Sequence, residues 1–178
     1  IQLKQAREQI RQLSNRDTLT GALNRVGFRA HLERAMGRSE RYGFKTALLY
    51  INIDQFANIN DHYGEADGDV MIKSISRRLI NKLRSTDSIA RLGGDEFVTL
   101  LTASSCNDIP EILNRFKIAL ELRNSQELRG YNIGFSVGYA NCNLDKDTPI
   151  NELLAAADSS MYTHKLELRT KKPPFSKS

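Results

Sequence analysis

Two short apolar runs on either side of a glycine pair constrain the fold of this chain more than any other feature. Residues 89–92 and 97–101 flank Gly93-Gly94, a pattern that predicts a β-hairpin. The apolar run at residues 46–54 predicts a largely buried strand, and residues 131–140 predict another. Helical patterns lie between and after these strands, at residues 25–41, 69–83, 109–123 and 150–168. The alternation predicts an α/β (α+β) domain with one central mixed sheet flanked by helices.

Length and composition agree with a single globular domain that needs neither disulfides nor a structural metal. The chain has 178 residues, of which 40% are hydrophobic and 26% charged, and a chain of this size buries about 70% of its unfolded surface on folding. Cys106 and Cys142 stand alone in the sequence, which fits a reducing compartment such as the cytoplasm. No apolar run approaches the roughly 18 residues of a membrane span, and no secretory signal pattern is found. Because the chain begins with Ile1, we expect it to be a piece of a longer protein.

The net charge of +5 does not indicate a nucleic-acid partner. Residues 1–16 carry +3 and residues 170–178 carry another +3, which leaves −1 for the body of the chain. A nucleic-acid-binding domain is basic on its folded surface, whereas this chain is basic only at its ends. We therefore expect no nucleic-acid partner.

The first 16 residues predict a helix that precedes the domain. Apolar residues recur there at spacings of three and four, as in a coiled-coil seam: Leu3, Ala6, Ile10 and Leu13. We interpret residues 1–16 as the end of a longer helical stalk, and an amphipathic helix packed against its own domain is the alternative. We expect residues 17–170 to form the domain and residues 171–178, which contain Pro173-Pro174, to form a disordered tail.

The hairpin carries two adjacent carboxylates, Asp95 and Glu96, at or just after its turn. Glycines adopt the positive φ that a tight turn needs, and they let a bulky ligand approach the backbone. Adjacent acids repel each other, so a fold gains little from this arrangement unless a cation or a substrate uses it. A solvated acidic turn is the alternative interpretation.

Two polar side chains share a face at the end of the strand predicted for residues 46–54. Asn52 and Asp54 are two residues apart, and the apolar residues beside them point the other way. Polar groups at the carboxyl end of a buried strand are typical of the mouth of a site. If the hairpin lies beside this strand, four oxygen-bearing side chains converge as ligands suited to Mg²⁺: Asn52, Asp54, Asp95 and Glu96. A strand that simply ends in solvent is the alternative.

Together these segments resemble the GGDEF domains, the diguanylate cyclases. Gly93-Gly94-Asp95-Glu96-Phe97 is the sequence for which that family is named, and residues 17–25 (DTLTGALNR) resemble its opening motif. Residues 52–69, which begin NIDQF, resemble its second motif, and residues 136–140 and 157–165 resemble its closing motifs. The matching segments occur in the family's order and cover residues 17–169, nearly the whole domain.

The resemblance implies a fold akin to the palm of nucleotide cyclases and polymerases. It also implies a reaction in which two GTP condense to cyclic di-GMP and two pyrophosphates. Each active site holds one GTP, so activity requires a homodimer whose two domains face each other. The stalk would set that pairing and pass on a signal from an upstream sensor domain, with a downstream domain as a further partner. The expected location is a cytoplasmic domain of a membrane-anchored or multidomain bacterial signalling protein.

The resemblance also implies metal-binding and catalytic roles at the hairpin and the neighbouring strand. Asp95 and Glu96 match the catalytic acids, of which Glu96 helps to activate the attacking 3′-hydroxyl. The implied ligands of Mg²⁺ or Mn²⁺ are Asn52, Ile53, Asp95 and Glu96. The cation would neutralise phosphate charge and lower the pKa of the hydroxyl.

Five residues match those that bind GTP in the family: Phe56, Asn60, Asp69, Lys165 and Arg169. The Asp69 carboxylate suits the N1 and N2 donors of guanine, and the Asn60 amide can serve the remaining edge. Lys165 and Arg169 lie four residues apart on one helical face and match cations that hold the triphosphate. Taken singly, these residues have ordinary interpretations as a turn asparagine, a helix N-cap (Asp69) and a solvated face.

Arg84-Ser85-Thr86-Asp87 lies nine residues before Gly93 and matches the inhibitory RxxD motif of the family. In that motif a stacked dimer of the product binds, and Arg84 and Asp87 are the implied site residues. Arginine suits this role because its planar guanidinium stacks on guanine and pairs with phosphate.

Four positions depart from the pattern of the family. Asn52 stands where active members usually carry an aspartate, so one negative charge is missing from the metal site. Ala57 replaces a lysine that often reaches phosphate, while Glu65 replaces a histidine and Leu168 a glycine, two changes for which we have no physical account. The alternative function is therefore a catalytically degenerate module that binds GTP or cyclic di-GMP and regulates a neighbouring domain. A scaffold that only dimerises is a third interpretation.

Overall fold

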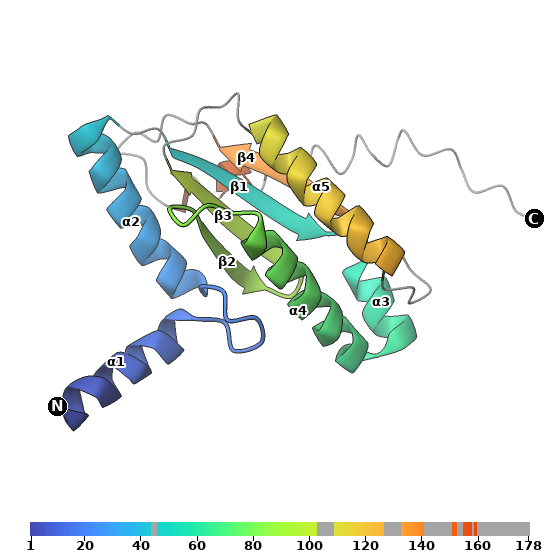
Figure 1. Cartoon of the computed structure of the whole chain (residues 1–178), viewed down its shortest axis with the longest axis horizontal. Coiled ribbons are helices and arrows are strands. Elements are labelled where there is room, and N and C mark those ends of the chain that lie inside the picture. Colours follow the sequence, from blue (N-terminus) through green and yellow to red (C-terminus); the bar gives the residue numbers. More distant parts are fainter. Residues whose placement is uncertain are drawn as a thin grey trace, which may run out of the picture.

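A central sheet with helices packed against it forms the body of the computed structural model (Figure 1). The structure describes residues 1–43, 46–102, 109–126, 133–140, 151–152, 155–157 and 159. Its elements follow in the order α1 (Gln2–Asn15), α2 (Arg25–Tyr42), β1 (Thr46–Ile53), α3 (Phe56–Tyr63), α4 (Glu65–Asn81), β2 (Ser88–Gly93), β3 (Glu96–Thr102), α5 (Ile109–Gln126) and β4 (Phe135–Ala140). The predicted fold class is confirmed.

The four described strands lie in the order β2-β3-β1-β4, and every pairing between them is antiparallel. This differs from the mixed sheet that the sequence predicts. The reason is that the hairpin returns β3 into the space between β1 and β2. The strands β1 and β2 therefore run in the same direction but do not pair with each other, as in a split βαβ unit. The one parallel pairing described is an isolated bridge between Leu23 and Ala90.

Both faces of the sheet are covered, and β1 is buried along its whole length. On one face, Ile51 packs in a cluster with Ile75 of α4 and Phe116 of α5. On the other face, Tyr50 packs in a second cluster with Phe28 of α2. Helices on both sides explain why residues 46–53 form a largely apolar run instead of one that alternates between apolar and polar residues.

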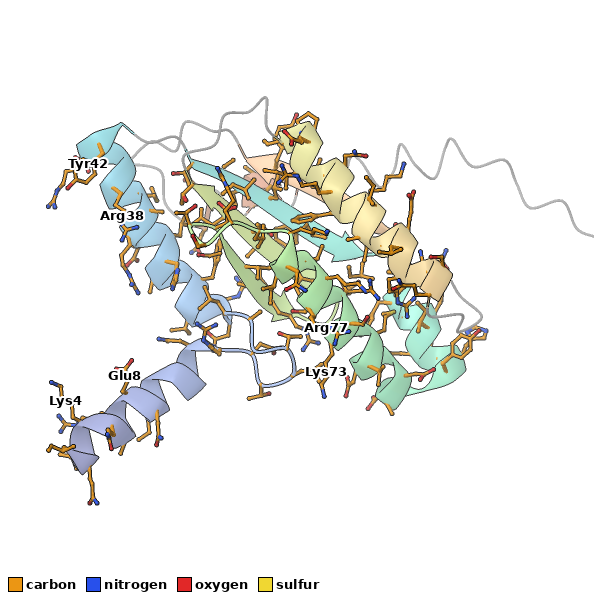
Figure 2. All side chains as sticks on the ribbon, viewed as in Figure 1. Lys4, Glu8, Arg38, Tyr42, Lys73 and Arg77 are labelled. Atoms are coloured by element: carbon orange, nitrogen blue, oxygen red, sulfur yellow. The ribbon has the colours of Figure 1, made fainter. Side chains whose placement is uncertain are left out.

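The helix α1 projects away from the sheet (Figure 1), and the labelled Lys4 and Glu8 lie on this helix, outside the body formed by the sheet and the helices packed on it (Figure 2). Two of its apolar residues lie in solvent, since Leu3 is 69% exposed and Ile10 is 65% exposed. The alternative that this helix packs its apolar face on its own domain is therefore wrong for these residues. Among the helices described, none is long and apolar enough to cross a membrane.

Asn24 joins the end of α1 to the start of α2. Its Oδ1 accepts a hydrogen bond from the Gly27 N–H at 2.9 Å, which caps the N-terminus of α2. Its Nδ2 donates to the Ser14 carbonyl at 2.6 Å and its N–H donates to the Asn15 carbonyl at 2.9 Å. A single side chain thus satisfies free backbone groups at two helix ends.

The helix α3 has no counterpart among the predicted elements. It is short and has one buried residue, Ile59, so it leaves no periodic apolar pattern in the sequence. The helix predicted for residues 69–83 begins four residues earlier, at Glu65, with Gly64 as its N-cap. The interpretation of Asp69 as a helix N-cap is therefore wrong. Of the closing helix predicted for residues 150–168, the structure describes a few residues, and all of those are helical.

His31 gives this fold a specific pH dependence. Its Nδ1 lies 3.1 Å from the Ser88 Oγ, and its pKa is lowered, first by partial burial and then by the charges of Arg34, Arg16 and Arg38. The unfolded chain therefore binds a proton at His31 more readily than the folded chain does. Stability from this residue is full above pH about 6.5 and is lost as the pH falls through the lowered pKa.

We expect His31→Gln to weaken the fall in unfolding free energy between pH 7 and pH 5. Urea unfolding at several pH values measures this, with the exposed His62→Gln as the matched control. The same pH dependence in both variants would contradict the assignment to His31.

Candidate active site

The β2–β3 hairpin closes through a two-residue loop, Gly94-Asp95, because Gly93 pairs with Glu96. Gly94 has a φ of +43°, a conformation that favours glycine at the first loop position. The register shifts between Arg91 and Gly93, which is a bulge of one residue just before the loop. Bulges beside a site change the direction of nearby side chains. Asp95 thus lies in the loop itself, and Glu96 is the first residue of β3.

The structure brings the hairpin next to the end of β1, which is the condition under which the sequence predicts a shared site. Asn52 is the cross-strand partner of Glu96, and the Ile53 N–H donates to the Asp95 carbonyl at 3.0 Å. Asp95 and Glu96 are both half-buried, and Asn52 is buried. Four of the predicted metal-binding and catalytic residues therefore meet at one end of the sheet: Asn52, Ile53, Asp95 and Glu96.

The side chain of Asn52 fits a role as a metal ligand. Its Oδ1 is buried and has no hydrogen-bond partner in the described part of the chain. A buried acceptor without a donor costs free energy, which a bound cation would recover. Together with the carboxylates of Asp95 and Glu96 it would supply an all-oxygen donor set of the kind Mg²⁺ prefers. Within the described residues no group of three or more His, Cys, Asp or Glu side chains is placed to hold a metal.

Asp54 has a different role from the one expected. Its Oδ1 accepts a hydrogen bond from the Ser136 Oγ of β4 at 2.8 Å, and its N–H donates to the Gly134 carbonyl at 2.9 Å. These contacts attach the end of β1 to β4, on the side opposite the hairpin. Asp54 therefore supports the edge of the site from the side of β4.

The corner between α3 and α4 brings two of the predicted base-reading residues together. Gly64 links the helices with a φ of +88° and donates its N–H to the Asn60 carbonyl at 2.9 Å. The Asn60 amide packs on the backbone of Gly68. Asp69, the next residue of α4, is exposed. Phe56, the first residue of α3, is half-buried and packs against the core. Lys165 and Arg169 lie outside the described residues.

Two residues of the site have no assigned role in the sequence analysis. Arg91 donates from Nε to the Gly94 carbonyl at 3.0 Å and from Nη1 to the Asp17 carboxylate at 3.3 Å. The side chains of Arg91 and Asp17 are only 14% and 19% exposed. Asp17 also accepts hydrogen bonds from the Thr20 N–H and hydroxyl. The ion pair thus ties the loop after α1 to the hairpin turn; the signal available in the sequence is an arginine two residues before Gly93.

The Arg84-Asp87 segment forms a second candidate site beyond the end of α4. Arg84 donates from Nε and Nη2 to the Asp87 carboxylate, at 3.2 and 3.4 Å. Asp87 also accepts from the Thr102 N–H at 3.2 Å and its side chain is almost fully buried, whereas that of Arg84 is half exposed. A cavity of about 190 Å³ here is lined in addition by Glu111 and Arg115 of α5. Arg115 lies 31 residues after Arg84, so only the tertiary structure shows that both face one cavity.

The sheet is antiparallel and helices cover both of its faces. Acidic residues lie at a hairpin turn beside the end of the central strand. This combination defines a nucleotide-cyclase-like class of domain. The family profile described as "Diguanylate cyclase, GGDEF domain" matches residues 14–171. The chain belongs to the GGDEF domain family.

Two bacterial relatives illustrate this membership. The diguanylate cyclase TpbB of Pseudomonas aeruginosa is 32% identical over 161 residues, which is 88% of this chain and 36% of TpbB. The diguanylate cyclase DgcP of the same species is 40% identical over 113 residues, which is 64% of this chain and 17% of DgcP. The chain thus spans 36% of the length of TpbB and only 17% of that of DgcP.

Solved structures agree with the fold. The GGDEF domain of P. aeruginosa TpbB superposes with a TM-score of 0.75 at 33% identity, covering 85% of this chain and 89% of that one. The coiled coil and GGDEF domain of Caulobacter crescentus DgcB, in complex with cyclic di-GMP, gives a TM-score of 0.80 over 93% of this chain and 88% of that one. At 24% identity the latter shows the fold alone.

Proposed function

We propose that this chain is a diguanylate cyclase domain that condenses two GTP into cyclic di-GMP and two pyrophosphates. The observation that carries the proposal is the buried Asn52 Oδ1, which has no partner in the described part of the chain and lies on the strand opposite Glu96. An acceptor so placed is suited to complete the coordination of a cation at the hairpin. The names of the relatives, diguanylate cyclases, support the same reaction.

The residues of the hairpin and of its neighbouring segments have different roles in the proposed reaction. Mg²⁺ or Mn²⁺, when held by Asn52, Ile53, Asp95 and Glu96, would supply positive charge against the phosphates. Glu96 is half-buried at the start of β3 and accepts the proton of the attacking 3′-hydroxyl. Arg91 and Asp17 hold the loop backbone in place through the Gly94 carbonyl. Such preorganised positioning supplies much of the catalysis in phosphoryl-transfer sites.

The remaining residues of the proposed site bind the nucleotide. Asn60 and Asp69 read the guanine edge, Phe56 packs beside the base, and Lys165 and Arg169 hold the triphosphate. A different base would leave polar groups of these residues without hydrogen-bond partners. This cost disfavours the binding of that base and makes the site specific for guanine.

The reaction requires a homodimer, and α1 supports that requirement. Leu3 and Ile10 are both exposed and lie seven residues apart, on one side of the helix. We assign α1 to the end of a coiled coil that brings two domains face to face and receives the signal of an upstream sensor domain. Under this proposal the chain is the cytoplasmic output domain of a longer signalling protein.

A catalytically degenerate module that binds GTP or cyclic di-GMP is the second candidate. The observation in its favour is the uncharged Asn52 at the metal site, together with the exposed Ala57 at the start of α3. Each replaces a charged residue that active members usually carry, so metal and phosphate are both held by fewer charges.

Product formation from GTP tests the proposal directly. The chain, stripped of nucleotide, is incubated with GTP and Mg²⁺, and separately with Mn²⁺, and the products are chromatographed. The assay is repeated with α1 fused in register to a strong coiled coil. Cyclic di-GMP in either form supports the cyclase, whereas no product from the enforced dimer, with cyclic di-GMP still bound, supports the degenerate module.

Arg84→Ala is expected to weaken cyclic di-GMP binding at least tenfold under either function. The half-exposed guanidinium of Arg84 lines the cavity beside α5 and is suited to a phosphate or a guanine face. Calorimetric titration with cyclic di-GMP measures the loss, and Arg29→Ala on the opposite face of the sheet is the control. Equal affinity in both variants would remove the product-binding assignment.

A further inference from the structure

Asn60 and Gly68 are in close contact across the corner between α3 and α4. A β-carbon at position 68 would collide with the Asn60 Oδ1 and would lie 2.9 Å from its Cγ. That Oδ1 is buried and has no hydrogen-bond partner within the described residues. The Asn60 amide therefore fills the space that any side chain at position 68 would need.

The backbone does not require glycine at position 68. Gly68 lies inside α4 and is absent from the residues of positive φ, in contrast to Gly64. Its N–H donates to the Gly64 carbonyl at 3.2 Å, and any residue type with a backbone N–H could make the same hydrogen bond. Glycine inside a helix is less favourable than alanine. The glycine at position 68 is thus explained by the space that the Asn60 amide needs.

We infer that Gly68 is a positioning residue for guanine recognition, because it lets the Asn60 amide lie folded against α4, next to Asp69. The inference rests on the proposed function, in which Asn60 and Asp69 read the base. The atoms that a methyl group would meet belong to the end of a flexible side chain. Alanine at this position is therefore expected to push the Asn60 amide into another rotamer and to leave the helix intact.

Nucleotide preference tests the positioning role. GDP and ADP are titrated in the presence of Mg²⁺, since GDP cannot release pyrophosphate and gives binding without turnover. We expect Gly68→Ala to lower the preference for GDP over ADP about tenfold, as Asn60→Ala does, through the lost base contact. The double variant loses no more than either single variant. The control is Gly37→Ala, an exposed helical glycine of α2 whose added β-carbon would meet nothing, and it leaves the preference unchanged.

Thermal unfolding without nucleotide separates this inference from the proposed function. In the Asn60→Ala background the obstacle is gone, so Gly68→Ala raises the unfolding midpoint more there than in the unmodified chain. Equal changes in both backgrounds, or a full GDP preference in Gly68→Ala while Asn60→Ala loses it, would overturn the positioning role. An unmodified chain with no preference for GDP would overturn the proposed function and the base-reading role with it, whereas the midpoint difference would still support the contact.

Discussion

Glu96→Gln is expected to lower the rate of cyclic di-GMP synthesis about a hundredfold or more while the domain stays folded. The side chain keeps its volume at the start of β3, opposite Asn52, but loses both the negative charge and the ability to accept a proton. General base catalysis typically contributes about 10²–10⁴ to a rate, which sets the size of the effect. The measurement is the initial rate from GTP in the coiled-coil-fused dimer, together with the midpoint of thermal unfolding.

Glu33→Gln is the matched control for this change. Glu33 is exposed on α2 and has no assigned role, so its variant is expected to retain the full rate. A Glu96→Gln variant with the rate of the control would remove Glu96 from the catalytic residues. A large drop in the unfolding midpoint would instead show that the carboxylate serves the fold.

Asn52→Asp is expected to make the stability of the domain depend more strongly on Mg²⁺ than that of the unmodified chain. The new carboxylate would be buried and would lie across from Glu96, so in EDTA the free energy of unfolding falls by about 2 kcal/mol. A cation bound between the two carboxylates reverses this loss, because a ligand that binds only the folded state stabilises it. If weak metal binding limits turnover, the same variant also raises the rate of cyclic di-GMP formation.

Urea unfolding in EDTA and in increasing Mg²⁺ checks this prediction. Asn58→Asp, on the exposed surface of α3, makes the same chemical change away from the hairpin and is expected to respond to Mg²⁺ no more than the unmodified chain does. An Asn52→Asp variant that responds to Mg²⁺ no more than this control would contradict a metal site at the hairpin. A stronger response without any gain in turnover would exclude weak metal binding as the cause of low activity.

Some elements were accessible to sequence reasoning because their signals are local. The β-hairpin follows from Gly93-Gly94 between two apolar runs, and the buried central strand follows from the continuous apolar run that became β1. The helix α3 was not accessible, because eight residues with a single buried side chain carry no periodic pattern. The sheet was expected to be mixed because the order of strands along the chain does not say that β3 lies between β1 and β2.

Some features of the candidate site could likewise be predicted from the sequence, and others could not. The sequence by itself determined the residue types of the hairpin and of the end of β1, and hence an oxygen-rich site at Asp95 and Glu96. It also determined that the hairpin needs glycine, since Gly94 adopts a positive φ. These properties depend on neighbouring residues and on intrinsic backbone preferences.

Only the tertiary structure decided which of the polar residues act together. It placed Asn52 opposite Glu96 but directed Asp54 to Ser136, although the sequence predicts both on one face of the same strand. It also paired Asp17 with Arg91, 74 residues apart. The physical reason is that such contacts arise from strand order and register, which depend on how the whole core packs and not on any local pattern.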